Sequence, residues 1–168
     1  CFFGGMEQVD RERSLIQFRN SSQRTLLATD LAARGIDIPG LDYIVHYEMP
    51  PREEEFTHRN GRTARMNADG TAICIKGKND KIPDYARGIK TKEIEEGAKI
   101  PKNKWKTIFV SGGRRDKISK GDIAGLFIKK GDLEGSELGV IELKTDCAFV
   151  AVSSIKADAL CHKLNNER

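Results

Sequence analysis

Short apolar segments alternate with helical patterns along the first half of this 168-residue chain, and this alternation constrains its fold most strongly. Strands are predicted for TLLAT at 25–29, LDYIVHYEMP at 41–50 and TAICIK at 71–76, and a helix for EQVDRERSLIQFRN at 7–20. A further helix is predicted after Pro50 and Pro51, where three glutamates form a solvated first turn that suits the helix dipole. Strands joined by crossover helices form a parallel sheet. We therefore expect an α/β fold with a partial parallel sheet and flanking helices.

The pattern changes near Lys76. Residues 77–104 are charged and contain scattered glycines and prolines, which indicates one short helix followed by a linker. Strands are then predicted at 105–111, 138–144 and 147–153, with helices at 120–130 and 156–166. This β-α-β-β-α order is one strand short of a ferredoxin-like unit, so we expect a small α+β domain without its last strand. The predicted organisation is a first domain at 1–90, a linker at 91–104 and a second domain at 105–168.

Composition narrows the classes of protein without choosing one. With 38% hydrophobic and 32% charged residues, the chain does not have the composition of a disordered protein. A net charge of +4 permits a nucleic-acid partner without requiring one. No apolar run reaches the length of a membrane helix, so we expect no membrane partner. The ends, CFFGG and CHKLNNER, indicate a fragment of a longer protein.

The four cysteines lie too far apart for a paired metal site. Three of them lie in apolar stretches. We expect buried thiols, a reducing cytoplasmic location and no metal site.

The segment HRNGRTAR at 58–65 places three arginines, a histidine and a glycine in eight positions. Such closely spaced arginines repel one another unless a concentrated negative charge lies among them, and a phosphate chain is the obvious candidate. Because Asn60-Gly61 commonly ends a helix, His58 should lie on the last helical turn, with Arg62 and Arg65 after it. The alternative is a basic helix end that pairs with glutamates of the first turn. This segment alone does not decide between the two.

Two more segments have features that suit phosphate binding. ATDLAARGID at 28–37 puts a threonine hydroxyl and free backbone N–H groups at the end of a predicted strand, with Asp37 placed to accept a ribose hydroxyl. The alternative there is an ordinary turn between strand and helix. FFGGMEQVDRER at 2–13 has two glycines before a helix, which allows a phosphate to approach the backbone closely.

Together, in this order and spacing, FGGMEQVDR, ATDLAARGID and HRNGRTAR resemble motifs IVa, V and VI in the second RecA-like domain of DEAD-box RNA helicases. The resemblance covers residues 1 to about 76. It implies that Arg62 and Arg65 reach the γ-phosphate of ATP, that His58 links them to catalytic motifs of the other domain, and that Asp37 holds the ribose. It also implies RNA contacts for Gly4, Gly5, Thr29 and Gly35, supported by Gln8 and Arg11. Ala64 and Glu48 depart from the family pattern without touching these roles.

The chain has no GxxxxGK[ST] phosphate loop and no DEAD sequence. The resemblance therefore implies that the first RecA-like domain, which would bind most of the ATP and Mg²⁺, lies outside this chain. It also implies that this missing N-terminal domain is a partner and that the present chain alone does not hydrolyse ATP.

From Trp105 to the end, the chain resembles the DbpA-type RNA-binding domain, an RRM-like fold found at the C-terminus of some bacterial DEAD-box helicases. The resemblance puts Phe109 and Phe149 at base-stacking positions, although Cys147 and Val152 replace usual aromatic residues. The two phenylalanines could equally be core residues.

The loop SGGRRDKISK offers another RNA surface in this second domain. It has two glycines that we expect to be exposed, Gly112 and Gly113, followed by cations that suit phosphate contact: Arg114, Arg115, Lys117 and Lys120. The alternative is a solvated basic loop.

The resemblance predicts the C-terminal part of an ATP-dependent RNA helicase. The appended domain would tether the enzyme to structured RNA, with ribosomal RNA and ribosome assembly as the expected setting. Two alternatives are a stand-alone RNA-binding fragment and a related DNA helicase of the same superfamily.

Overall fold

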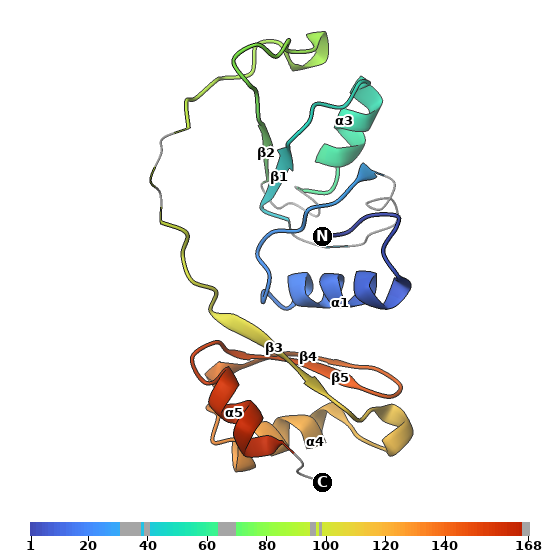
Figure 1. Cartoon of the computed structure of the whole chain (residues 1–168), viewed down its shortest axis with the longest axis vertical. Helices are drawn as coiled ribbons and strands as arrows, with labels where there is room; N and C mark the ends of the chain where they lie inside the picture. Colours follow the sequence, from blue (N-terminus) through green and yellow to red (C-terminus); the bar gives the residue numbers. More distant parts are fainter. Residues whose placement is uncertain (31–37, 39–40, 64–69, 95–96, 98, 166–168) are drawn as a thin grey trace. The chain divides into compact units, whose positions relative to one another are not determined.

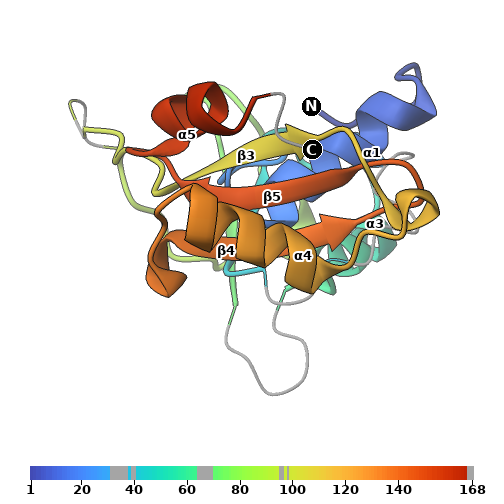
Figure 2. The ribbon, with the colours of Figure 1, turned by 90° about the horizontal axis from the view of Figure 1, so that it is seen from below.

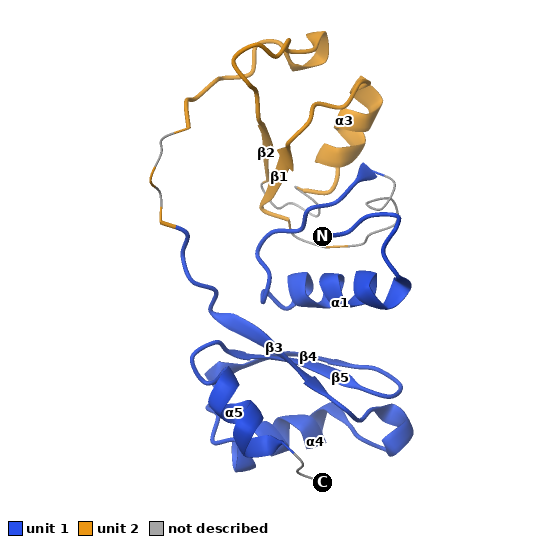
Figure 3. Cartoon of the chain, viewed as in Figure 1, with its two compact units in different colours: residues 1–33, 100–168 blue, residues 34–99 orange. Residues whose placement is uncertain are grey.

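The computed structural model describes residues 1–30, 38, 41–63, 70–94, 97 and 99–165. Its contacts divide the chain into two compact units (Figure 3). The first unit combines Cys1–Ala33 with Ile100–Arg168, and the second is Arg34–Lys99.

The first unit is built on a three-stranded antiparallel sheet with the order β3-β5-β4. Its strands are β3 (Trp105–Val110), β4 (Leu138–Leu143) and β5 (Ala148–Ser153). Side chains alternate between the two faces of a strand. Ile108 therefore points to the opposite face from Phe109, and Val150 to the opposite face from Phe149.

Helices cover one face of this sheet (Figures 1 and 2). They are α4 (Lys120–Gly125), the five-residue π-helical continuation η3 (Leu126–Lys130) and α5 (Ala157–Leu164). Phe127 and Leu160 from these helices pack with Val150 and Val152 of the sheet, and all four are almost fully buried. Two short 3-10 turns, η2 (Arg114–Asp116) and η4 (Gly135–Glu137), complete the connections.

The other face of the sheet meets α1 (Gln8–Arg19) (Figure 1). Ile16 of this helix is completely buried, and Asn20 at its C-terminal end is 3% exposed. The sheet therefore has an apolar face against α4, η3 and α5, and a more polar face against α1.

The second unit contains two parallel strands, β1 (Tyr43–His46) and β2 (Thr71–Cys74). Between them in sequence lies α3 (Glu53–Asn60), and a 3-10 turn, η1 (Asp84–Ala86), follows β2. The predicted α/β character of the first half is thus confirmed for these elements.

Three expectations need correction. The predicted strand at 25–29 forms only a single parallel bridge, between Ala28 and Phe2. The thiols are not all buried, because Cys1 and Cys161 are exposed while Cys74 and Cys147 are half-buried. Cys161 has apolar neighbours in sequence, but it projects from the exposed side of α5.

The third correction concerns Gly112 and Gly113, which are buried rather than exposed. The reason is tertiary: a Cβ at Gly113 would lie 2.6 Å from backbone atoms of Thr145, Asp146 and Cys147.

Within the described residues, every helix is too short or too polar to span a lipid bilayer.

Candidate nucleic-acid and nucleotide interface

The C-terminal end of α3 presents the cationic segment in the second unit. His58 and Arg59 lie on the last helical turn, as predicted, and the helix ends at Asn60. The backbone then leaves in two tight turns, in which the Arg62 N–H donates to the Arg59 carbonyl at 3.1 Å and the Thr63 N–H to the Asn60 carbonyl at 3.0 Å. Arg62 is the second residue after the helix and is half-buried. Arg65 lies outside the described residues.

A buried histidine attaches this helix end to the parallel sheet. His46 at the end of β1 is 1% exposed, and its Nε2 lies 2.8 Å from Oδ1 of Asn60. Because an amide oxygen only accepts, Nε2 carries the proton, and Nδ1 is left to accept from Arg59 Nη1 at 3.5 Å. Arg59 Nη1 also donates to the Glu48 carbonyl at 2.9 Å. These bonds fix Asn60 and Arg59, and thereby the direction in which the chain continues toward Arg62.

Aromatic packing supports the same helix. The Phe56 ring lies between His46, at a centroid distance of 4.7 Å, and Tyr85, at 5.2 Å. The Tyr85 hydroxyl donates to the Pro50 carbonyl, and burial raises the pKa of this phenol above its usual value. On the far side of the turn, the Thr63 hydroxyl donates to the Leu41 carbonyl. The cationic segment is therefore held on both sides by buried contacts.

In the first unit, the two glycine-containing segments lie next to each other. The Phe2 N–H donates to the Leu27 carbonyl at 2.7 Å, and the Thr29 N–H donates to the Phe2 carbonyl at 3.2 Å. This pairing brings Thr29 close in space to the exposed turn of Gly4 and Gly5. Gly35 and Asp37 lie outside the described residues.

The first turns of α1 carry the two supporting residues. Gln8 is exposed at the first helical position, whereas Arg11 is half-buried. The Arg11 Nε is buried and has no hydrogen-bond partner among the residues that the structure describes. An unsatisfied buried donor is uncommon and costly, which makes Arg11 a candidate for contact with a ligand.

The basic loop of the C-terminal sheet has a fixed backbone and free side chains. The Arg114 N–H donates to the Lys144 carbonyl at 3.0 Å, and the Arg115 N–H to the Thr145 carbonyl at 2.8 Å. Lys117 adopts a left-handed conformation with φ of 61°. The cationic side chains are all exposed, and in the described part of the chain none of them forms an ion pair: Arg114, Arg115, Lys117 and Lys120. Such a loop can bind phosphate without first breaking internal contacts.

Phe109 and Phe149 do not belong to the apolar core. They are paired across β3 and β5, on the face opposite Ile108 and Val150, with ring centroids 5.6 Å apart in an edge-to-face arrangement. Phe109 is 55% exposed. Cys147, on the connection before β5, is half-buried, and burial raises the pKa of its thiol.

Within the described residues, no three His, Cys, Asp or Glu side chains are grouped closely enough to hold a metal ion.

Sequence reasoning missed two groups of residues that the structure brings together. His46 was read only as part of a strand, and its partner Asn60 lies 14 residues later. Arg13 and Gln17 of α1 face the C-terminal sheet, about 90 residues away in sequence. Their spacing of four residues shows that they share a helix face, but it carries no signal of what that face meets.

Comparison with known proteins yields two families. Residues 1–67 match the family described as "Helicase conserved C-terminal domain", and residues 107–168 match the "DbpA RNA binding domain". ATP-dependent RNA helicase DbpA of Escherichia coli K12 is 32% identical over 177 aligned residues, which cover 95% of this chain and 36% of that protein.

Two plant proteins match a smaller share of the chain. The mitochondrial DEAD-box ATP-dependent RNA helicase 9 of Arabidopsis thaliana is 42% identical over 66% of this chain and 17% of its own length. DEAD-box ATP-dependent RNA helicase 49 of the same plant is 51% identical over 54% of this chain and 16% of its own length. The chain thus spans between 16% and 36% of these relatives.

Proposed function

We propose that this chain, which belongs to the DEAD-box RNA helicase family, is the C-terminal part of an ATP-dependent enzyme that locally unwinds or remodels structured RNA. The observation that carries the proposal is the end of α3, where the buried His46 and its half-buried partner Asn60 orient a cationic segment whose sequence resembles the family's motif VI. Parallel pairing of β1 and β2 beside this helix supports a RecA-like core for residues 1–90. Residues 91–104 would be the linker.

The second domain, at 105–168, is proposed to be an RRM-like, ferredoxin-like fold without its last strand. Its observed elements follow the order strand, helix, strand, strand, helix. The first and third of these strands, β3 and β5, are neighbours in the sheet, which leaves an edge of β3 open to a further strand.

ATP would be bound between this domain and the missing first RecA-like domain. Planar guanidinium groups suit phosphate oxygens, and an arginine that stabilises the transition state of phosphoryl transfer contributes roughly 10³ to 10⁵ in rate. Arg62 and Arg65 would supply these groups, His58 would join them to the other domain, and Asp37 would bind the ribose. The missing domain would supply the phosphate loop and hold Mg²⁺.

RNA would be bound by the enzyme's core through its backbone. The adjacent positions of Thr29 and the turn of Gly4 and Gly5 support one continuous phosphate-binding surface, to which we also assign Gly35. Gln8 and Arg11 would lie beside it, and the unsatisfied Arg11 Nε fits this role. Contacts of this kind do not read sequence.

The C-terminal domain would tether the enzyme to its RNA. Arg114, Arg115, Lys117 and Lys120 would bind phosphates, and Phe109 would stack on an unpaired base. Tethering raises the local concentration of the substrate without changing the catalytic core. We propose structured ribosomal RNA as the target, in ribosome assembly and in the cytoplasm.

The test is RNA-stimulated ATP hydrolysis by the full-length protein with Arg62→Ala. We expect the rate to fall by about 10³-fold or more, because the substitution removes a transition-state contact. Arg52→Ala is the matched control, since Arg52 is an exposed arginine at the other end of α3, and its rate should be unchanged.

Equal rates for the two variants would contradict the role of Arg62. Stimulation by DNA in place of RNA would favour the related DNA helicase, and absence of any hydrolysis would favour a non-catalytic RNA-binding protein.

A further inference from the structure

The sheet of the C-terminal domain offers its aromatic pair on the face that meets α1. Thr107 and Phe109 of β3 and Phe149 of β5 share this face, because the partners of Thr107 and Phe109 in β5 are Ala151 and Phe149. Ala151 is 1% exposed although it points away from the apolar core. This face of the sheet is therefore shielded from solvent at Ala151 and accessible to solvent at Phe109.

A buried hydrogen-bond cluster holds the C-terminal end of α1 to this face. Asn20 Nδ2 donates to the Thr107 hydroxyl at 2.8 Å, and that hydroxyl lies 2.7 Å from Ser22 Oγ. Ser22 also accepts at its carbonyl from Asn103 Nδ2 at 2.8 Å. Asn20 and Ser22 are both buried, so breaking this cluster would leave polar groups unsatisfied.

Ion pairs extend the contact along the helix. Lys144 Nζ lies 2.5 Å from Glu12 Oε1, and Arg19 Nε lies 3.7 Å from Glu142 Oε1. All four side chains are partly exposed, and exposed ion pairs contribute little to the free energy of folding. These two pairs therefore act mainly to orient the helix. Together with the cluster, they fix α1 above the sheet.

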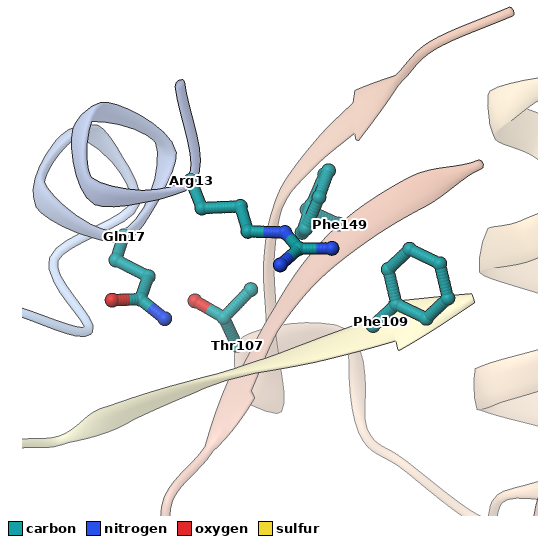
Figure 4. Close-up of a pocket in the computed structure, with 5 residues that line it drawn as sticks. All are labelled: Arg13, Gln17, Thr107, Phe109 and Phe149. Carbon is teal, nitrogen blue, oxygen red and sulfur yellow. The ribbon is translucent and has the colours of Figure 1, made fainter. Parts of the chain in front are cut away.

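Between the helix and the sheet remains a hollow of about 260 Å³, lined by Arg13, Gln17, Thr107, Phe109 and Phe149 (Figure 4). The Arg13 side chain extends from α1 toward the two phenylalanines, and the Gln17 amide points toward Thr107 (Figure 4). Within the described residues, Arg13 forms one ion pair, a contact of 3.6 Å with Asp10 in which both side chains are more than half exposed. Its guanidinium is therefore available to a ligand.

We propose that this hollow binds one unpaired nucleotide of RNA, so that α1 contributes Arg13 and Gln17 to a site shared with the C-terminal sheet. The flat guanidinium and the exposed Phe109 ring are both surfaces on which a base stacks. The Gln17 amide both donates and accepts, which suits the edge of a base. The proposal rests on the proposed RNA binding by the C-terminal domain and adds to it the residues from α1.

This shared site has a mechanistic consequence. The same helix carries Gln8 and Arg11 in its first turns and Arg13 and Gln17 further along, so RNA bound by the core and a nucleotide bound on the sheet would both contact α1. Binding of RNA to the core would then help to position the nucleotide on the sheet, and binding of the nucleotide would help to position the RNA on the core.

The test is a double-mutant cycle in the 168-residue chain, with fluorescently labelled single-stranded octamers of uridine or adenosine as probes. Arg13→Ala and Phe109→Ala should each weaken binding by roughly tenfold. Arg13→Lys should weaken it nearly as much, because lysine keeps the charge but loses the planar group. Arg24→Ala, which removes an exposed cation outside the hollow, should change binding by less than about twofold.

The decisive quantity is the loss in the double variant Arg13→Ala with Phe109→Ala. If both residues hold the same nucleotide, the double variant should bind about as weakly as the worse single variant, whereas independent contacts would multiply to roughly a hundredfold. Multiplied losses, or tighter binding on removal of Arg13, would overturn the shared site. The latter would show that α1 obstructs the sheet.

Failure of the shared site can be distinguished from failure of the proposed function. If Arg13→Ala has no effect while Arg114→Ala with Arg115→Ala weakens binding, RNA binding stands and the shared site is refuted. If the unmodified chain binds neither octamer nor an RNA hairpin, the RNA-binding function itself fails and the shared site fails with it. The emission of Trp105 on β3 reports that each variant is folded.

Discussion

Gly113→Ala tests the packing that presents the basic loop. A Cβ at Gly113 would meet three backbone atoms at 2.6 Å, about 0.8 Å closer than the 3.4 Å at which ordinary contact begins. Because these atoms belong to backbone, they cannot rotate away as a side chain could. Relief requires the loop to separate from residues 145–147, which stretches the bonds from the Arg114 and Arg115 N–H groups.

Overpacking of this kind costs about 1 to 3 kcal/mol, and each weakened hydrogen bond adds about 1 kcal/mol. With two such bonds weakened, we therefore expect Gly113→Ala to lower the free energy of unfolding of the first unit by about 3 to 5 kcal/mol. With a urea dependence of about 1 to 3 kcal/mol/M, the midpoint should fall by at least roughly 1 M.

The assay is urea unfolding followed by fluorescence. The chain has a single tryptophan, Trp105 on β3, so its emission reports the unfolding of the first unit. Gly121→Ala is the control: it makes the same chemical change in α4, where the nearest atom to the new Cβ is a serine oxygen at 3.5 Å. Alanine is the better helix former by about 1 kcal/mol, so the control midpoint should rise. Equal midpoints for Gly113→Ala and the unmodified chain would refute the reasoning.

Three further predictions concern single contacts. Ser119→Ala removes the side chain that caps α4 and should lower the free energy of unfolding by about 1 kcal/mol in the same urea assay; an unchanged midpoint would contradict the cap. The hydrogen bond from Lys156 lowers the pKa of Glu137, so its stabilisation is present above the unfolded pKa and is lost as the pH falls through the folded pKa. Thermal melts should therefore show that Glu137→Gln reduces the loss of stability below about pH 4, and parallel curves would contradict this. Asn60→Ala leaves the buried His46 donor without an acceptor and should speed amide exchange in β1 by roughly tenfold, whereas unchanged exchange would show that the bond is dispensable.

Local patterns predicted the elements well where a single periodicity applies. The helices that became α1, α3 and α5 and the strands that became β3, β4 and β5 follow from spacing of apolar residues and from proline and glycine positions. The segment at 25–29 reads as a strand by the same rule. It forms only a bridge because its pairing partner, Phe2, contributes a single residue.

Which face of each strand is buried was harder to predict than the position of the strand in the sequence. Ile108 and Phe109, or Phe149 and Val150, are adjacent apolar residues, so alternation alone cannot say which faces the core. The pairing of β3 with β5 and the helices on one face decide it. No local pattern indicates that residues more than 30 positions later bury Gly113, or that Arg13 faces a strand far along the chain.

The most direct test of the central proposal is the salt dependence of RNA binding. We would measure the affinity of the 168-residue chain for an rRNA hairpin, an unrelated hairpin and a single strand across a salt series. The same series is measured for the double variant Arg114→Ala with Arg115→Ala. Each lost phosphate contact reduces the slope of log affinity against log salt by about 0.9 for a duplex and about 0.7 for a single strand, so this variant should bind more weakly with a slope smaller by roughly 1.4 to 1.8.

Lys90→Ala with Lys92→Ala removes the same charge from exposed positions in the other unit and should leave the slope unchanged. Preference for the rRNA hairpin that persists at higher salt, and is lost in the arginine variant alone, is the result we predict. Equal slopes for both variants, with equal and weak binding to all three RNAs, would contradict a C-terminal domain that directs a helicase to its RNA.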